Sequence, residues 1–310
     1  MVRRISLLRE EVTDACRLLS GEAEDVPGLI VERFGPALVI HVQQPLPLTR
    51  RQLAQVAHWY RQWLPVRSVC VYHVPRGSSG MKPGDSGVML RTVLGRKLPD
   101  EIIVSENGLR FAVRIRETTA VGLYPSHREN RARVRALAAG REVLNLFAYT
   151  CGFSVAAAMG GADRVVSVDL SAAHLEWGKH NFELNGLDPG PHAFLSSDAL
   201  DYLKRAARRG ESFDLIVLDP PTFAHGRRRG KDFSVSRDLA ELVTGAVRLL
   251  RPNGMMLVST NYRRMSFDGL RRHIRRGAAG RRIKKMQFVP LPPDYAVDPD
   301  HAKSVIVHFA

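Results

Sequence analysis

The second part of the chain alternates short apolar runs with longer segments in which apolar residues recur every three or four positions. The short runs predict buried strands, and the longer segments predict amphipathic helices between them. The predicted strands cover residues 142–147, 164–169, 192–196, 213–218, 255–260, 283–289 and 303–309. Because strands and helices alternate, the pattern favours a mostly parallel, doubly wound α/β sheet with helices on both faces.

Residues 1–100 show a different pattern and are predicted to form a small α+β domain, a candidate for binding RNA or substrate, in front of an α/β domain at 101–310. The apolar spacing predicts helices at 7–19 and 48–63, and Gly35-Pro36 predicts the turn of a β-hairpin. A chain of 310 residues is long enough for two domains that each bury their own core.

The predicted strand at 213–218 ends in Asp219-Pro220-Pro221-Thr222-Phe223. Proline can neither donate a backbone N–H nor continue a sheet, so Asp219 is expected in a stiff, extended turn at the carboxyl end of the strand. Ligands bind at that end in open α/β sheets. This rigid loop combines a carboxylate, a backbone carbonyl and an aromatic ring. Such a combination is suited to a site that binds a planar base. The alternative interpretation is a strand with a proline-rich exit.

Two classes of ligand suit such a sheet: dinucleotides, and the sulfonium methyl donor of methyltransferases. A dinucleotide site needs Gly-x-Gly-x-x-Gly after the first strand, whereas the turn at 145–152 contains one glycine. Asp169 and Asp198 follow the second and third strands, where carboxylates can accept hydrogen bonds from ribose hydroxyls and from an adenine amino group. Each acid alone suits a helix cap, but three acids at successive strand ends, with Asp219 the last, favour a ligand site.

The net charge of +15 is concentrated in one part of the chain. Residues 221–290 hold 17 Lys and Arg against 4 Asp and Glu. Charge gathered beside one candidate site predicts a polyanionic partner and favours nucleic acid over solvated helix faces in an arginine-rich protein.

Composition excludes several other classes of protein. No apolar run approaches the roughly 20 residues of a membrane span, and the N-terminus lacks a signal-like segment, so a cytoplasmic protein is expected. The cysteines, Cys16, Cys70 and Cys151, are widely scattered, which supports neither a disulfide framework nor a metal site.

The motifs together resemble a known family. Residues 105–310 resemble the class I S-adenosylmethionine-dependent methyltransferases that modify 23S ribosomal RNA. The matching motifs are Glu106-Asn107-Gly108-Leu109, Gly122-Leu123-Tyr124 leading into Arg128, Leu144-Asn145-Leu146-Phe147-Ala148-Tyr149-Thr150, Gly160-Gly161-Ala162, Val166-Ser167-Val168-Asp169 and Asp219-Pro220-Pro221-Thr222-Phe223. Residues 1–100 resemble the domain that precedes the catalytic domain in the cytosine-C5 branch. That branch usually carries a further N-terminal PUA module, which this chain is expected to lack.

The resemblance implies a Rossmann-like fold with an antiparallel last strand, S-adenosylmethionine as cofactor and no metal. The cofactor-binding residues that it implies are Tyr124, Arg128, Asn145, Phe147, Tyr149, Thr150, Asp169, Asp198 and Asp219. Among these, Arg128 would pair with the methionine carboxylate of the cofactor. Ser126 stands where the family has Asp in a Leu-Asp-x-Arg pattern, a departure that concerns the orientation of Arg128.

The remaining site residues concern the RNA substrate and the methylated atom. Catalytic roles are expected for Asp219, Pro220 and Asn261, and substrate contacts for Pro221, Phe223, Arg227, Arg228, Arg229 and Arg263. Methylation of cytosine C5 needs a thiolate that first adds to C6, but the turn at 259–262 contains no cysteine. Cys151, which stands in the cofactor turn where the family has glycine, is expected to be a buried thiol.

Guanine N7 is already nucleophilic and is the preferred acceptor. The guanine-N7 branch of the family also shares motifs resembling Leu175-Glu176-Trp177 and Val235-Ser236-Arg237-Asp238. An exocyclic amine remains an alternative acceptor, because Asp219 and the Pro220 carbonyl can accept hydrogen bonds from an NH2 group. Two other functions compete: a small-molecule methyltransferase, and a non-catalytic RNA-binding or ribosome-assembly protein that retains the cofactor pocket. The oligomeric state is left open, with a homodimer among the options.

Overall fold

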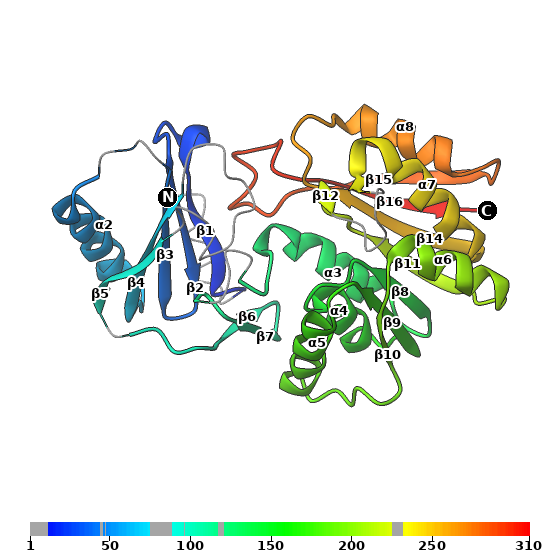
Figure 1. The fold of residues 1–310 in the computed structure, drawn as a ribbon, viewed down its shortest axis with the longest axis horizontal. Helices are drawn as coiled ribbons and strands as arrows, with labels where there is room; N and C mark the ends of the chain where they lie inside the picture. Colours follow the sequence, from blue (N-terminus) through cyan, green and yellow to red (C-terminus); the bar gives the residue numbers. More distant parts are fainter. Residues whose placement is uncertain are drawn as a thin grey trace. The chain divides into compact units, whose positions relative to one another are not determined.

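A computed structural model describes residues 12–43, 46, 48–74, 89–95, 97–116, 121–224 and 232–310. The chain divides into two compact units (Figure 1). Unit 1 comprises Met1–Pro125 and Pro293–Asp298, and unit 2 comprises Ser126–Pro292 and Pro299–Ala310. Among the described helices, none is long and apolar enough to cross a membrane.

Unit 1 is built on a five-stranded sheet in the order β1-β2-β3-β4-β5. The strands are β1 (Ala15–Ser20), β2 (Leu29–Phe34), β3 (Ala37–Gln43), β4 (Ser68–Val74) and β5 (Met89–Gly95). Only β3 and β4 run parallel, and α2 (Arg50–Trp63) connects them and packs on the sheet. Thr49 and Gln52 form a capping box that satisfies backbone N–H groups at the start of this helix.

The sequence predicted most of unit 1 but mistook one strand for a helix. The hairpin at Gly35-Pro36 and the helix near 48–63 are confirmed. The helix expected at 7–19 is wrong for residues 15–19, which belong to β1 and pair antiparallel with β2; residues 1–11 lie outside the described part. Cys16 and Leu18 alternate into the core, so pairing with β2 overrides the apparent helical spacing.

A separate hairpin follows the five-stranded sheet in unit 1. It consists of β6 (Ile102–Glu106) and β7 (Leu109–Val113), and two short 3₁₀ helices, η2 (Gly21–Glu24) and η3 (Pro125–His127), lie elsewhere in the chain. The predicted domain boundary near residue 100 falls just before this hairpin and stays a prediction.

Residues 293–298 join unit 1 through a buried ionic network. The Asp294 carboxylate accepts a hydrogen bond from the Arg17 backbone N–H at 3.0 Å, and the Tyr295 hydroxyl donates to Glu32 at 3.1 Å. The Arg17 guanidinium pairs with Glu32 at 2.9 Å and lies 4.3 Å from the centroid of the Tyr295 ring. Burial raises the pKa of Glu32, but the attraction and hydrogen bonds of Arg17 and His41 together outweigh burial and hold this pKa below its ordinary value.

Unit 2 is built on a seven-stranded sheet in the order β10-β9-β8-β11-β14-β16-β15. The strands are β8 (Glu142–Leu146), β9 (Arg164–Asp169), β10 (Ala193–Ser196), β11 (Phe213–Leu218), β14 (Leu250–Thr260), β15 (Ile283–Val289) and β16 (Lys303–Phe309). The first five strands in this order run parallel, whereas β16 is antiparallel to both of its neighbours. The predicted mostly parallel sheet with an antiparallel last strand is therefore confirmed.

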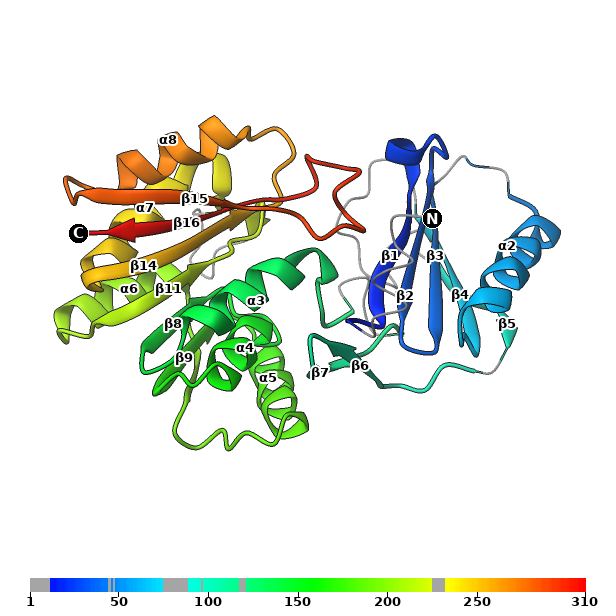
Figure 2. The same ribbon diagram turned by 180° about the vertical axis from the view of Figure 1, so that it is seen from behind.

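Helices cover both faces of this sheet (Figures 1 and 2). They are α3 (Arg128–Leu137), α4 (Gly152–Met159), α5 (Ala172–Leu184), α6 (Ala199–Arg208), α7 (Val235–Arg248) and α8 (Phe267–Gly277). One apolar core packs α3 and α4 against the sheet, and a larger core packs α6, α7 and α8 against its other face. A short ribbon of β12 (Phe223–Ala224) and β13 (Phe233–Ser234) lies between β11 and α7 in the sequence.

The carboxyl ends of the five parallel strands lie side by side at one edge of the sheet. Leu218 at the end of β11 pairs with Leu146 of β8, and Leu146 pairs with Val168 of β9. On the outer side, Asp169 of β9 pairs with Ser196 of β10. The loops that follow these strands are therefore neighbours, although they are far apart in the sequence.

Candidate functional site

The turn after β8 has an unusual backbone. Phe147, Tyr149 and Cys151 have φ angles of 59°, 50° and 61°, which lie in the left-handed region. Residues with a Cβ rarely adopt this region, because it costs about 1–2 kcal/mol per residue. Three such residues at alternate positions indicate a conformation that the surrounding structure enforces, as is common at ligand sites.

The end of β9 enforces this conformation. The Ala148 N–H donates to the Val168 carbonyl at 3.0 Å, and the Tyr149 N–H donates to Oδ2 of Asp169 at 2.8 Å. The other carboxylate oxygen of Asp169 accepts from the Ser171 N–H at 2.9 Å. Asp169 thus braces two loops. Its Oδ1 also lies 3.5 Å from Nδ1 of His174, and its Oδ2 retains a further lone pair for a ligand.

The end of β10 brings a second carboxylate beside Asp169. The Ser197 N–H donates to the Asp169 backbone carbonyl at 2.9 Å, and Asp198 follows directly. Oδ1 of Asp198 caps α6 by accepting from the Asp201 N–H at 3.1 Å. A cap uses one oxygen, so Asp198 can serve the helix and a ligand at the same time.

Two other predicted cofactor residues are buried under the turn. Asn145 donates to the Ser154 hydroxyl at 2.9 Å and thereby fastens β8 to α4. The Thr150 carbonyl accepts from the Asn181 side chain at 2.9 Å, which fastens the turn to α5. Asn145 and Thr150 are 1% and 2% exposed, so the side chains of this pair shape the turn from beneath.

Cys151 is a buried thiol, as the sequence predicted. Its side chain is fully buried in the turn, and burial raises the pKa of the thiol to about 12. A thiol with so high a pKa carries almost no thiolate at neutral pH, so it is a poor nucleophile.

Cys151 also packs tightly against Gly178 of α5. A Cβ added at Gly178 would overlap the Cys151 Sγ and lie 2.8 Å from its Cβ. We therefore expect Gly178→Ala to lower the free energy of unfolding by about 1–3 kcal/mol through overpacking. In a Cys151→Gly background, which removes the clashing thiol, the same substitution should cost much less. Urea unfolding of both single variants and the double variant measures this coupling; strictly additive effects would contradict the packing argument.

At the end of β11, Asp219 lies against a histidine. Oδ2 of Asp219 is 3.2 Å from Nε2 of His127, which is buried at the start of α3. The Asn130 side-chain NH2 lies 2.7 Å from Nδ1 of His127 and donates to the Ser304 hydroxyl at 2.8 Å. The Ser304 hydroxyl in turn donates to the Ser259 hydroxyl at 3.0 Å.

Both ring nitrogens of His127 are engaged, Nδ1 by the Asn130 side chain and Nε2 by the Asp219 carboxylate. These two contacts hold the imidazole ring in place. The network therefore orients Asp219 from α3, β14 and β16 at once.

The motif after β11 is also tied to the turn after β14. The Thr222 hydroxyl donates to Oδ1 of Asn261 at 2.8 Å, so two segments that the sequence singled out separately meet in the structure. Pro220 is buried, whereas Pro221 is exposed and the Phe223 side chain is 52% exposed. An exposed aromatic ring beside two fixed loops can stack on a planar ligand.

The remaining predicted site residues differ in how far the structure buries them. Arg128, at the start of α3, is fully buried, and a buried guanidinium requires an anionic or polar environment. Tyr124 belongs to unit 1 and is 47% exposed. Arg263 is exposed two residues after Asn261, and Arg227, Arg228 and Arg229 lie outside the described residues.

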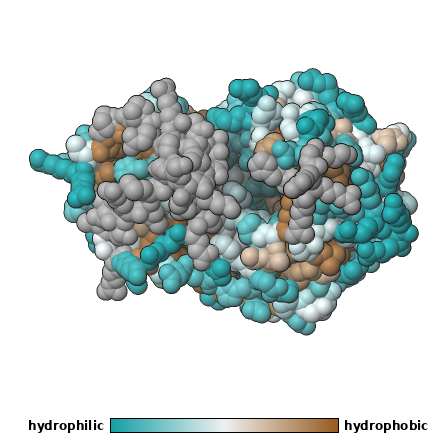
Figure 3. Space-filling view, viewed as in Figure 1, coloured by the Kyte–Doolittle hydropathy of each residue, from teal (hydrophilic) through white to brown (hydrophobic). Residues whose placement is uncertain are grey.

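Basic side chains continue along α8. Arg271, Arg272, Arg275 and Arg276 are all exposed on this helix, and hydrophilic residues gather over it in Figure 3. Within the described ranges, no group of three or more His, Cys, Asp or Glu side chains could hold a metal ion.

Sequence reasoning missed His127 and Asn130. Their spacing of three places them on one helix face, which was the available signal. Nothing in the sequence connected that face with Asp219.

Residues 89–307 match the family model described as S-adenosylmethionine-dependent methyltransferase. Ribosomal RNA large subunit methyltransferase K of Neisseria meningitidis is 41% identical over 174 residues, which cover 56% of this chain and 49% of that protein. Ribosomal RNA large subunit methyltransferase K/L of Alteromonas mediterranea is 32% identical over 298 residues, which cover 92% of this chain and 39% of that protein. The chain thus spans about half or less of the length of these curated relatives.

Solved structures share the fold over almost the whole chain. The crystal structure of SMU.776, described as a methyltransferase complexed with SAH, superposes with a TM-score of 0.84 and 27% identity, covering 99% of this chain and 78% of that one. A methyltransferase from Agrobacterium tumefaciens has a TM-score of 0.70 and 22% identity, covering 96% and 90%.

Proposed function

Because the chain belongs to the family of S-adenosylmethionine-dependent methyltransferases, we propose that it methylates a base of large-subunit ribosomal RNA, at guanine N7. The names of its relatives support the ribosomal substrate. The concentration of positive charge in residues 221–290 supports a nucleic-acid substrate independently.

The proposal rests on the groups that unit 2 presents to a cofactor at the ends of β9 and β10 and at the start of α3. Asp169 presents a fixed carboxylate at the end of β9, suited to two ribose hydroxyls, and Asp198 presents another beside it for the adenine amino group. The buried guanidinium of Arg128 is suited to the carboxylate of an amino acid. These groups fit a cofactor with an amino-acid end, a ribose and an adenine but no phosphate.

When bound, S-adenosylmethionine supplies an electrophilic methyl group on a positively charged sulfur. The protein's own task is then to align an acceptor with that group and to exclude water. Asp219 and the Pro220 carbonyl would hold the base edge, Phe223 would stack on the base, and Asn261 would keep the motif in place through Thr222.

All three cysteines of the chain are buried, which supports an acceptor other than cytosine C5. Cys16 and Cys70 belong to unit 1, and Cys151 has a raised pKa beneath the cofactor turn. At the end of β14, Ser259 and Thr260 are completely buried and carry no thiol. Buried thiols are poor sources of the thiolate that must add to C6 in C5 methylation.

Guanine N7 fits these residues because it carries a lone pair and no proton. Methylation leaves a positive charge on the purine ring, and a carboxylate held nearby stabilises that charge as it develops. The His127–Asn130 network would supply this orientation for Asp219.

The base assignment predicts the outcome of nucleoside analysis. Ribosomal RNA from a strain that lacks the gene should lose one 7-methylguanosine of its large-subunit RNA, measured by mass spectrometry of digested nucleosides. Complementation with the intact gene should restore it. Loss of 5-methylcytidine or of an N2-methylated guanosine would overturn the N7 assignment, and unchanged rRNA with methylation of a small molecule would overturn the RNA substrate.

A further inference from the structure

The outer face of α2 in unit 1 carries exposed aromatic side chains that the core does not use. Trp59 is 43% exposed and Trp63 is 66% exposed, whereas Trp177, the third tryptophan of the chain, is buried. The opposite face of α2 packs Leu53 and Ala57 against the sheet. Folding of unit 1 therefore does not account for large apolar rings on the solvent side of this helix.

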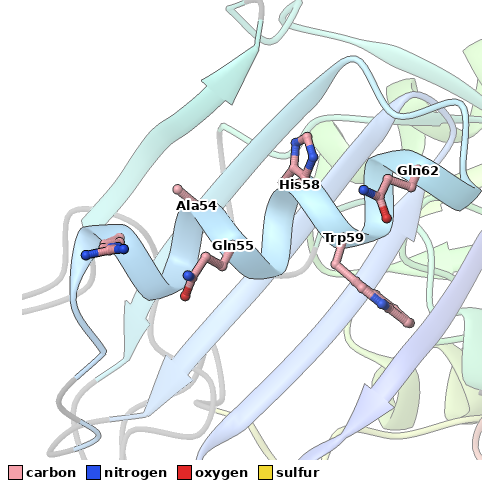
Figure 4. Close-up of a pocket in the computed structure, with 6 residues that line it drawn as sticks. Ala54, Gln55, His58, Trp59 and Gln62 are labelled. Atoms are coloured by element: carbon pink, nitrogen blue, oxygen red, sulfur yellow. The ribbon is translucent and has the colours of Figure 1, made fainter.

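The two tryptophans are arranged as neighbours. They are four residues apart on one helix, so one ring follows the other along the helix surface by about 6 Å. Trp59 also borders a surface pocket whose side chains project from α2 (Figure 4). The pocket is lined by Arg51, Ala54, Gln55, His58, Trp59 and Gln62.

The helix that carries these tryptophans is positively charged. Helix α2 contains Arg50, Arg51 and Arg61 and no acidic residue. Arg51 lines the same pocket as Trp59, whereas Arg50 and Arg61 lie about half a turn around the helix from the tryptophans. In the sequence, no Asp or Glu occurs from position 34 to position 84. Exposed aromatic rings in a stretch with positive charge and no carboxylate are complementary to a ligand that combines planar rings with anions.

We propose that the outer face of α2 binds a single-stranded segment of RNA, in which unpaired bases stack on Trp59 and Trp63 and a phosphate contacts Arg51. Base–aromatic stacking is independent of sequence and strengthens binding by about tenfold or more per base. The surface extends the proposed function and rests on it for the identity of the polyanion. It would give the enzyme a second RNA contact outside unit 2.

Charge argues against self-association through the same face. In a two-fold symmetric dimer, a patch meets a copy of itself. Arg51 of one copy would then approach Arg51 of the other with no carboxylate of α2 between them. RNA neutralises this charge, whereas a second copy adds to it.

Tryptophan fluorescence tests this surface without depending on turnover. Titration of the full chain with a 12-nucleotide oligouridylate should quench the emission of Trp59 and Trp63, and the buried Trp177 provides an internal reference. Trp59→Ala/Trp63→Ala should weaken RNA binding by about tenfold or more, and Trp59→Phe/Trp63→Phe should retain most of the affinity because phenylalanine also stacks. Phe288→Ala, which removes an exposed ring from β15 in unit 2, is the matched control and should bind normally.

Salt dependence tests the phosphate contact. Each phosphate contact to a single strand contributes about −0.7 to the slope of log affinity against log salt. Arg51→Gln should therefore reduce the magnitude of this slope by about 0.7, and Arg61→Gln, which changes the other side of the helix, should leave it unchanged. In methylation assays on ribosomal RNA, the alanine variants should show their loss in KM for RNA rather than in kcat.

These measurements separate the two proposals. Quenching that depends on both tryptophans, in a protein that methylates no rRNA, would support the surface and overturn the proposed function. Intact methylation with unchanged RNA affinity and KM in the alanine variants would overturn the surface alone. Quenching by anionic phosphatidylglycerol vesicles but not by RNA would also overturn it. A third result would overturn the surface. Sedimentation would detect a dimer, and the alanine substitutions would dissociate that dimer without any effect on RNA binding.

Discussion

Replacing Asp219 by alanine is expected to reduce methyl transfer to RNA by at least about 100-fold in kcat, because it removes the carboxylate that faces the reacting base. The affinity for S-adenosylmethionine should stay within a few-fold, since Asp169, Asp198 and Arg128 are intact. Single-turnover methylation of ribosomal RNA measures the first quantity, and calorimetric titration with the cofactor measures the second. Unimpaired turnover in Asp219→Ala would show that the carboxylate takes no part in the reaction.

His127 provides a sharper test of the same site. It acts as a positioning residue, so His127→Gln should lower kcat by a smaller factor than Asp219→Ala. Combined with Asp219→Ala, the His127 substitution should cost almost nothing more, because its target is already absent. A purely structural role would instead lower stability and turnover in both backgrounds alike.

Loss of the Asp169 carboxylate is the second change with a large expected effect. Two charged hydrogen bonds to ribose hydroxyls would be removed, so the Kd for S-adenosylmethionine should rise by about 10- to 100-fold in Asp169→Ala. RNA affinity should change little, because the substitution leaves the basic surface intact. Equilibrium titrations with the cofactor and with an RNA oligonucleotide measure these two affinities separately.

Asp169 also braces the turn, so a structural control is required. The carboxylate accepts N–H groups from Tyr149 and Ser171, and its loss would relax both loops. Asp169→Asn retains one oxygen and the side-chain shape, and should bind the cofactor more tightly than Asp169→Ala. Asp268→Ala removes an exposed carboxylate from α8 and should leave cofactor affinity unchanged. Unaltered affinity in a folded Asp169→Ala variant would exclude the ribose contact.

The sequence by itself determined the architecture of unit 2 and the edge at which the site lies. Apolar runs alternating with amphipathic segments leave few ways to pack a sheet, and the carboxyl ends of parallel strands share one edge. The acids at 169, 198 and 219 could therefore be assigned to one site before any contact was known. The absence of a cysteine at 259–262 could also be established from the sequence, because it depends only on which residues occupy those positions.

The tertiary structure decided which side chains meet. Hydrophobic periodicity reports how a segment faces the core but says nothing about contacts between distant segments. For that reason the sequence showed neither the contact between His127 and Asp219 nor the hydrogen bond between Thr222 and Asn261. Residues 15–19 carry helical spacing, yet they become a strand because β2 supplies backbone partners that only the folded sheet provides.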